Sequence, residues 1–552
     1  MPHVAWENRA AAKRASVQKA IPTPWRVSPD QIPRREDRLP ILDVPQKYLS
    51  EDELIITETA PLDTLANIHA GIWSSEDVVR AYCHRAAVCH QFSNCLTEVL
   101  FEEAIKTARE LDQYRREKGC LQGPLHGLPI SFMDRFRVAG TETAAGFISW
   151  LGPKETETTE SLSVRHMRTL GAIPFCKTNV PQSMSLAETT NNIHGSTRNP
   201  HSGLLSSGGA AGGEGALLAM KGSPFGWATE FAGSARIPAA LNGLFSLKVS
   251  SGRLPTLGIA SSDSSLPSRN FTIAMMSWDF PLLRHMARLC LGAAAYDEDP
   301  TWVDMPWMEA KIRELMPRRP TFAVLECDGN VQPQPPIRRA LRSIIHSLRR
   351  ADYQVLEWNP PPHAAAVQAY FKTIGADGAQ ATRQHIKEGG EPPVPMLREW
   401  YFQDTTEPLP LPEYLTLIRS LRKYQAEYQK FWKSTGKSTI NGIPVDAVIM
   451  PVCANAACYE NTLTYFGYSA IVNVLDFPAV SFPAGSVDKT LDPKTSSFVP
   501  LSPEDNSVNA SYNSSAFHGA PIGLQLMCRR FEEEKAIRLV ELVLQAQAAF
   551  QA

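Results

Sequence analysis

Two glycine-rich segments of the chain carry serine hydroxyls where a serine could attack a carbonyl carbon. Residues 206–215 read SSGGAAGGEG and lead into a short helical stretch, and residues 228–236 read ATEFAGSAR. Glycines let the backbone turn sharply and approach a ligand closely. A serine hydroxyl becomes a useful nucleophile only when a neighbouring base removes its proton as the new bond forms. The two segments therefore direct attention to Ser234 and to any base that could serve it.

Five segments, in order along the chain, resemble the amidase signature family, whose members cut amide C–N bonds. They are GPLHGLPISFMDRF (123–136), KTNVPQSMSLAETTNNIHGSTRNP (177–200), GGAAGGEGALLAMKGSP (208–224), ATEFAGSARIPAALNGLFSLKVSSGRLP (228–255) and GAPIGLQLMCRRFEEEKAIRLVE (519–541). The chain is most similar to the fungal acetamidase branch of that family. The resemblance covers nearly the whole chain and implies the family's α/β fold.

The resemblance also implies a catalytic relay, and two of its three positions hold side chains that cannot move a proton. In the family, a buried neutral lysine takes the proton of the serine nucleophile through a bridging serine. Carried over position by position, the lysine falls on Met133, the bridging serine on Ala210 and the nucleophile on Ser234. A thioether and a methyl group cannot serve as base or relay. Because losing the base costs a serine hydrolase roughly 10⁴- to 10⁶-fold in rate, classical amide hydrolysis is not expected.

The turn before the nucleophile position also departs from the family pattern. The family's Ile-Gly-Gly reads Phe231-Ala232-Gly233 here, and its usual aspartate is Glu230. In the family, backbone N–H groups of this turn bind the negative oxygen that forms during amide cleavage. The replacements keep the backbone donors but place a methyl group at Ala232. The retained glycine turn further predicts that the peptide bond before Ala210 keeps the cis form of the family's bridging serine.

Three residues are candidates for a substitute base, and each has a structural alternative. Glu230 offers a carboxylate, with hydrogen bonding inside the loop as its alternative role. Asp134 offers a second carboxylate, and together with Arg135 it could supply acid–base or ion-pair functions; a salt bridge at the end of the strand is the simpler interpretation. His194 lies in the segment 177–200, but a lone histidine more often fills a structural role than a catalytic one.

The order of short apolar runs and helical patterns predicts an α/β fold, with one mixed central sheet covered by helices and an N-terminal helical arm. We expect the arm over residues 1–60 and a single amidase signature domain over residues 61–552. Strands are expected over 124–133, 172–181, 321–329, 353–358, 446–452 and 478–485. Helices are expected over 75–91, 102–119, 212–222, 335–351 and 531–550.

Composition limits the partners and the compartment. The formal net charge of -2 gives no electrostatic reason to expect nucleic acid or an anionic membrane surface. No run approaches 18 apolar residues, and the N-terminus lacks the apolar core of a secretory signal. The ten cysteines are scattered without a metal-type cluster, which indicates reduced thiols in a cytoplasmic protein and neither a metal nor a cofactor. Homodimer formation is expected only by analogy with the family.

Three hypotheses for function follow from the missing base. The first is a repurposed enzyme of specialised metabolism that performs cyclisation, condensation or isomerisation of a small, apolar molecule, because Met133 and Ala210 make the pocket less polar. The second is an amidase or esterase that acts through Ser234 with a substitute base. The third is a pseudoenzyme that only binds a ligand or a partner protein. We favour the first.

Overall fold

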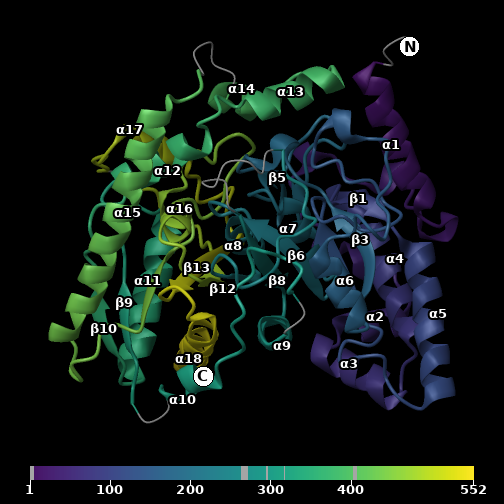
Figure 1. The fold of residues 1–552 in the computed structure, drawn as a ribbon, viewed down its shortest axis with the longest axis horizontal. Helices are drawn as coiled ribbons and strands as arrows, with labels where there is room; N and C mark the ends of the chain where they lie inside the picture. The colour runs from purple at the N-terminus through teal and green to yellow at the C-terminus, as the bar shows by residue number, and fades with distance from the viewer. Residues whose placement is uncertain are drawn as a thin grey trace.

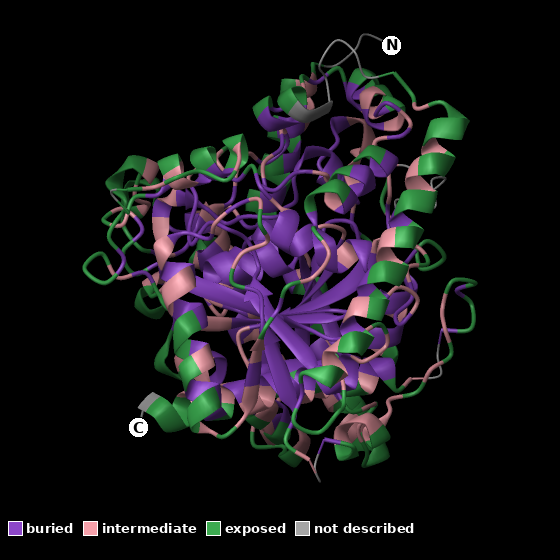
Figure 2. Cartoon of the chain, turned by 90° about the vertical axis from the view of Figure 1, so that its left-hand side faces the viewer, coloured by how far each residue is buried: buried purple, intermediate pink, exposed green. Residues whose placement is uncertain are grey.

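A mixed β-sheet forms the centre of the molecule. The computed structural model describes residues 5–262, 271–293, 296–315, 318–401, 407–495 and 497–551. Within them, eleven strands form one sheet in the order β1-β3-β2-β6-β8-β7-β12-β13-β11-β9-β10. Figure 2 shows the buried strands surrounded by helices whose outer surfaces are exposed.

The strands of this sheet are short and almost fully buried. They are β1 (Leu96–Val99), β2 (Pro129–Met133), β3 (Ile173–Thr178), β6 (Phe225–Glu230), β7 (Phe245–Lys248), β8 (Thr272–Ser277), β9 (Thr321–Val324), β10 (Gln354–Glu357), β11 (Ala447–Pro451), β12 (Ala479–Ser486) and β13 (Pro521–Met527). A separate antiparallel pair consists of β4 (Arg198–Asn199) and β5 (Ser202–Ser206).

Helices cover both faces of the sheet and its two sides (Figure 1). They are α1 (Trp6–Ala20), α2 (Glu51–Glu58), α3 (Pro61–Ala70), α4 (Ser75–Ser93), α5 (Phe101–Lys118), α6 (Leu162–Thr169), α7 (Gly212–Ala219), α8 (Arg236–Asn242), α9 (Phe280–Leu291), α10 (Glu309–Arg313), α11 (Pro335–Arg350), α12 (Ala364–Ile374), α13 (Gln380–Gly389), α14 (Pro395–Tyr401), α15 (Leu411–Ser434), α16 (Gly467–Val474), α17 (Pro503–Ser511) and α18 (Glu533–Gln551). The two short helices α7 and α8 pack on the central strands and carry the glycine-rich segments. The α/β class and the amidase signature fold predicted from the sequence are confirmed.

Local sequence signals explain where the predicted helices begin and end. The hydroxyl of Ser74 accepts a hydrogen bond from the N–H of Asp77 at 3.0 Å and caps α4. Helix α5 ends at Gly119, which adopts a left-handed conformation with φ of 69°. The predicted helices and strands are confirmed, although several strands are shorter than expected; the run 321–329, for example, pairs only as Thr321–Val324.

The apolar runs did not predict β1, β6, β7, β8 or β13, and of these β6 is the strand that leads into the turn at Ser234. It lies between β2, to which it is parallel, and β8, to which it is antiparallel. Its six residues are all buried. Because the carboxyl ends of parallel neighbours lie at the same edge of a sheet, the end of β2 at Met133 and the end of β6 at Glu230 bring two of the family's motifs together.

Candidate active site

The three positions assigned to the family's relay line one small cavity. Met133 is the last residue of β2, Ala210 lies in the loop before α7, and Ser234 lies in the turn between β6 and α8. All three border a cavity of about 50 Å³ together with Thr229 and Phe231. Met133 and Ala210 are each 1 % exposed and belong to the main apolar core. The structure therefore brings together the three positions that the sequence comparison assigned to one site.

Backbone contacts between the two glycine-rich segments fix this arrangement. The N–H of Ala211 donates to the carbonyl oxygen of Ser234 at 2.9 Å. Gly209 has a φ of 55°, and a side chain there would collide with the ring of Pro238. The hydroxyl of Thr189 donates to the carbonyl oxygen of Gly209 at 2.9 Å and accepts from the N–H of Gly212 at 2.8 Å. Glycine is required at position 209 for both its conformation and its lack of bulk.

The prediction of a cis peptide bond before Ala210 is wrong. Every peptide bond in the described part of the chain is trans. For a residue other than proline the trans form is favoured by about 2.5–4 kcal/mol, and the retained glycines accommodate the turn through their φ angles instead.

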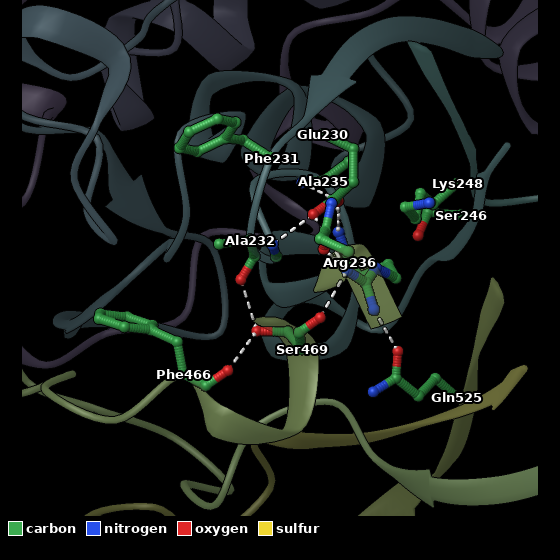
Figure 3. A network of polar contacts seen from close by, with 12 residues as sticks. Glu230, Phe231, Ala232, Ala235, Arg236, Ser246, Lys248, Phe466, Ser469 and Gln525 are labelled. Carbon is green, nitrogen blue, oxygen red and sulfur yellow. Dashed lines mark hydrogen bonds and ion pairs between the residues drawn. The ribbon is translucent and has the colours of Figure 1, made fainter. Parts of the chain in front are cut away.

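The turn that precedes Ser234 is held by Glu230 (Figure 3). Its carboxylate accepts hydrogen bonds from the N–H groups of Gly233, Ala235 and Arg236. The same carboxylate pairs with the Arg236 guanidinium at 3.2 Å, and both side chains are fully buried. Glu230 therefore has the hydrogen-bonding role that was its alternative in the sequence, and its oxygens are not available to act as a base for Ser234.

A second set of contacts anchors this turn to helix α16 and strand β13 (Figure 3). Arg236 donates through Nη1 to Gln525 Oε1 at 2.6 Å and through Nη2 to the carbonyl oxygen of Ser469 at 2.9 Å. The Ser469 hydroxyl donates to the carbonyl oxygen of Ala232 at 2.6 Å. Arg236 is thus structural, and it connects the turn to α16 and β13.

Two backbone N–H groups of this turn are free to bind a ligand, and a third is occupied by a hydrogen bond within the protein. The N–H of Gly233, predicted as part of the oxyanion-binding group, donates to Glu230 instead. Among the described residues, the N–H groups of Ala232 and Ser234 have no acceptor within the protein. Two donors of this kind, close together in one turn, can bind an oxygen that gains negative charge during a reaction.

The other two candidates for a substitute base lie outside the cavity. Asp134 forms an ion pair with Lys177 at 2.7 Å, and both side chains are buried. Burial raises the pKa of the Asp134 carboxyl, and Lys177 opposes part of that rise. Burial lowers the pKa of His194 well below its usual range, and this residue does not line the cavity. The predicted salt bridge at the end of the strand is present for Asp134, and its partner is Lys177 of β3.

Arg135, which the sequence offered with Asp134 for acid–base or ion-pair functions, is the member of that pair that lies in the cavity. Its side chain lines the same cavity as Ser234 and stacks over the ring of Phe271, with Cζ 3.8 Å from the ring centroid. Its Nη1 donates to Thr229 Oγ1 at 2.9 Å, and that hydroxyl is 3.6 Å from Met133 Sδ. The sequence signal was present, because a charged residue follows shortly after the buried strand β2 and the relay position at its end.

A larger pocket adjoins the small cavity. It has a volume of about 980 Å³ and shares its border with the cavity at Met184, Ser185, Phe231, Ser234 and Ala379. Helix α12 and the residues around Phe466 form much of its wall. A ligand can therefore place a small group in the inner cavity and a larger body outside it.

Two further features concern metals and membranes. In the ranges that the structure describes, no three His, Cys, Asp or Glu side chains are grouped closely enough to hold a metal ion. No described helix combines the length and apolar character needed to cross a membrane.

Comparison with known proteins places this geometry in context. Residues 77–537 match the family model described as Amidase. The chain is 36 % identical to an acetamidase of Aspergillus oryzae, over 98 % of this chain and 99 % of that protein. It is 34 % identical to an acetamidase of Emericella nidulans, over 98 % and 97 % of the two chains. A solved structure of fatty acid amide hydrolase is similar with a TM-score of 0.90 at 28 % identity, covering 98 % of this chain and 95 % of that one.

Proposed function

The chain belongs to the amidase signature family, and from this premise we propose that it converts a small carbonyl compound without using a serine nucleophile. The reaction class is cyclisation, condensation or isomerisation in specialised metabolism. One observation carries the proposal: of the side chains that line the Ser234 cavity in the described part of the chain, none is a histidine, carboxylate, lysine or cysteine.

The proposed chemistry uses the turn rather than the hydroxyl. In a cyclisation, a nucleophile on the substrate itself adds to the carbonyl carbon, and the C=O π electrons move to the oxygen. The N–H groups of Ala232 and Ser234 stabilise that negative oxygen, which then takes the proton released by the nucleophile. Because both partners belong to one bound molecule, correct orientation supplies much of the rate acceleration.

Hydrolysis through Ser234 is the second candidate, and a specific observation favours it. The similarity to acetamidases extends over nearly the whole chain, and the serine at the end of the turn is retained. In this alternative Ser234 attacks an activated ester or amide, and a group on the substrate removes its proton. The third hypothesis, a binding protein without turnover, uses the same pocket.

A serine-directed fluorophosphonate separates these alternatives. The protein is incubated with the reagent, and intact mass and peptide mapping then show whether Ser234 is phosphonylated, with Ser234→Ala as the control. The proposal expects no label on a folded protein. Stoichiometric labelling of Ser234 would mean that the hydroxyl is activated and would replace the proposal by hydrolysis or acyl transfer.

Turnover in water enriched in ¹⁸O then tests the reaction class. A hydrolase incorporates ¹⁸O into its acid product, whereas cyclisation or isomerisation leaves the product unlabelled. Absence of any turnover of carbonyl compounds by a protein that binds them would support the binding-protein hypothesis.

A further inference from the structure

Arg135 differs from the other buried arginines of the described chain because it has no carboxylate partner there. Four arginines of the described chain are buried, and three of them pair with carboxylates. Arg85 pairs with Glu58 at 2.7 Å, Arg236 with Glu230 at 3.2 Å, and Arg253 with Glu534 at 2.8 Å. Arg135 is 7 % exposed, yet no carboxylate of the described residues lies within 4.0 Å of it.

This unpaired charge is costly in a buried position. Taking a cation out of water is unfavourable unless an opposite charge and hydrogen bonds replace the lost solvent. Arg135 has hydrogen bonds to two neutral oxygens only, Thr229 Oγ1 through Nη1 and the carbonyl oxygen of Ala260 through Nε, both at 2.9 Å. Burial lowers the pKa of Arg135 to about 9, so the side chain is still cationic at neutral pH.

The same contacts hold the guanidinium group in a fixed orientation. Nε and Nη1 are tied to the protein, and the plane stacks over Phe271. Among the described residues, Nη2 has no acceptor, and the side chain borders the cavity. A planar cation that is oriented in advance loses little freedom when it binds a carboxylate.

We propose that Arg135 binds a carboxylate of the ligand inside the cavity beside Ser234. A carboxylate fits this cavity. The cavity volume of about 50 Å³ is several times the roughly 10–15 Å³ that one water molecule requires, so it can hold a group of a few heavy atoms. The rest of the ligand occupies the adjoining pocket. This inference rests on the proposed function in one respect, since it places the carboxylate on the same molecule as the carbonyl group.

The inference changes the expected ligand from an apolar molecule to a carboxylic acid. Met133, Ala210 and Phe271 still form apolar walls around the site. The charge requirement comes from Arg135 alone, because it is the only ionisable side chain among the described residues that border the cavity.

Binding of propionate and of propionamide tests the inference on the unaltered protein. The two probes have nearly the same shape, and only propionate is charged. A titration of ¹³C-labelled probes, followed by NMR, is expected to show propionate binding about 10- to 100-fold more tightly than propionamide, the range of a charge-assisted hydrogen-bonded contact. Equal affinity for both probes overturns the inference, and no variant is needed for this comparison.

Variants then locate the contact. Arg135→Gln is expected to weaken propionate binding to the level of propionamide, whereas Arg135→Lys keeps part of the preference. Arg319→Gln is the matched control, since Arg319 is exposed and forms a surface pair with Asp352. Unchanged propionate binding in folded Arg135→Gln protein overturns the inference. Fluorophosphonate labelling of Ser234 would overturn the proposed function and leave carboxylate binding intact, so the two failures are distinguishable.

Discussion

Reintroducing a lysine and a serine at the two positions assigned to the family's relay is the most direct test of whether their replacement removes amide hydrolysis. The double substitution Met133→Lys and Ala210→Ser replaces a thioether, whose Sδ lies 3.6 Å from Thr229 Oγ1, by a side chain whose amine lies two bonds beyond that sulfur position. The same hydroxyl is 2.9 Å from Arg135 Nη1, which puts the new amine on the order of 6.5 Å from the guanidinium. Two unit charges at that distance repel by about 2.5 kcal/mol at an effective dielectric constant of 20.

This repulsion favours the neutral form of the new lysine. It corresponds to a fall of about 2 pKa units from the ordinary value near 10.4, and burial lowers the pKa further. A neutral amine is the form that accepts a proton from serine. Acetamide hydrolysis is therefore expected to rise with pH, to be largely present above about pH 8, and to exceed that of the unaltered chain by about 10³-fold or more.

Release of ammonia from acetamide between pH 7 and 9 is the assay. The control is the double variant that also carries Ser234→Ala, which keeps the lysine but removes the nucleophile. Thermal unfolding confirms that each variant is folded. If the folded double variant releases no more ammonia than its control, the missing relay does not by itself explain the loss, and the altered turn at Phe231-Ala232 must also prevent hydrolysis.

Two stability predictions follow from buried charges near the site. Burial raises the pKa of Glu214 to about 8. Between about pH 5 and 7 the folded protein therefore keeps a proton that the unfolded chain has released. Because the folded state binds more protons, the free energy of unfolding falls as pH rises, by up to about 1.4 kcal/mol per pH unit. Glu214→Gln keeps an acceptor for the Ser131 hydroxyl. In urea unfolding, its stability advantage over the unaltered protein is expected to grow as pH rises from about 5 to 7. A difference that does not depend on pH would contradict the raised pKa of Glu214. Arg236→Met leaves Glu230 buried without its cation and is expected to lower the free energy of unfolding by about 3–5 kcal/mol. Arg319→Ala removes an exposed ion pair and is expected to change stability far less. Equal effects of the two substitutions would count against the buried network.

The sequence predicted most of the fold because its signals are local or follow a fixed order. Apolar runs bounded by proline and glycine predicted six of the eleven strands described in the sheet, and the cap at Ser74 and the glycine at position 119 marked helix ends. The strand β6 was not predicted because it overlaps a motif whose glycine and serine residues are typical of a catalytic turn. Its position at the centre of the sheet is a matter of pairing between distant segments.

The partners of charged side chains could not be predicted from adjacency. Asp134 and Arg135 are consecutive in the turn that follows β2, and their side chains reach different neighbouring strands. Asp134 therefore meets Lys177 of the neighbouring strand β3, and Arg135 meets Thr229 of β6. Both contacts depend on which strands flank β2, and that order is a tertiary property.

The sequence by itself determined the family, the α/β architecture and the residue types at the three positions that the resemblance assigns to the relay. These are properties of residue types in order, and Met133 and Ala210 cannot accept or relay a proton in any fold. Only the tertiary structure decided that these residues share a cavity with Ser234, that Glu230 is used to hold the turn, and that Arg135 lies in the cavity without a carboxylate partner among the described residues. The reason is that burial, hydrogen bonding and charge pairing depend on segments far apart in the chain, which meet only when the sheet is assembled.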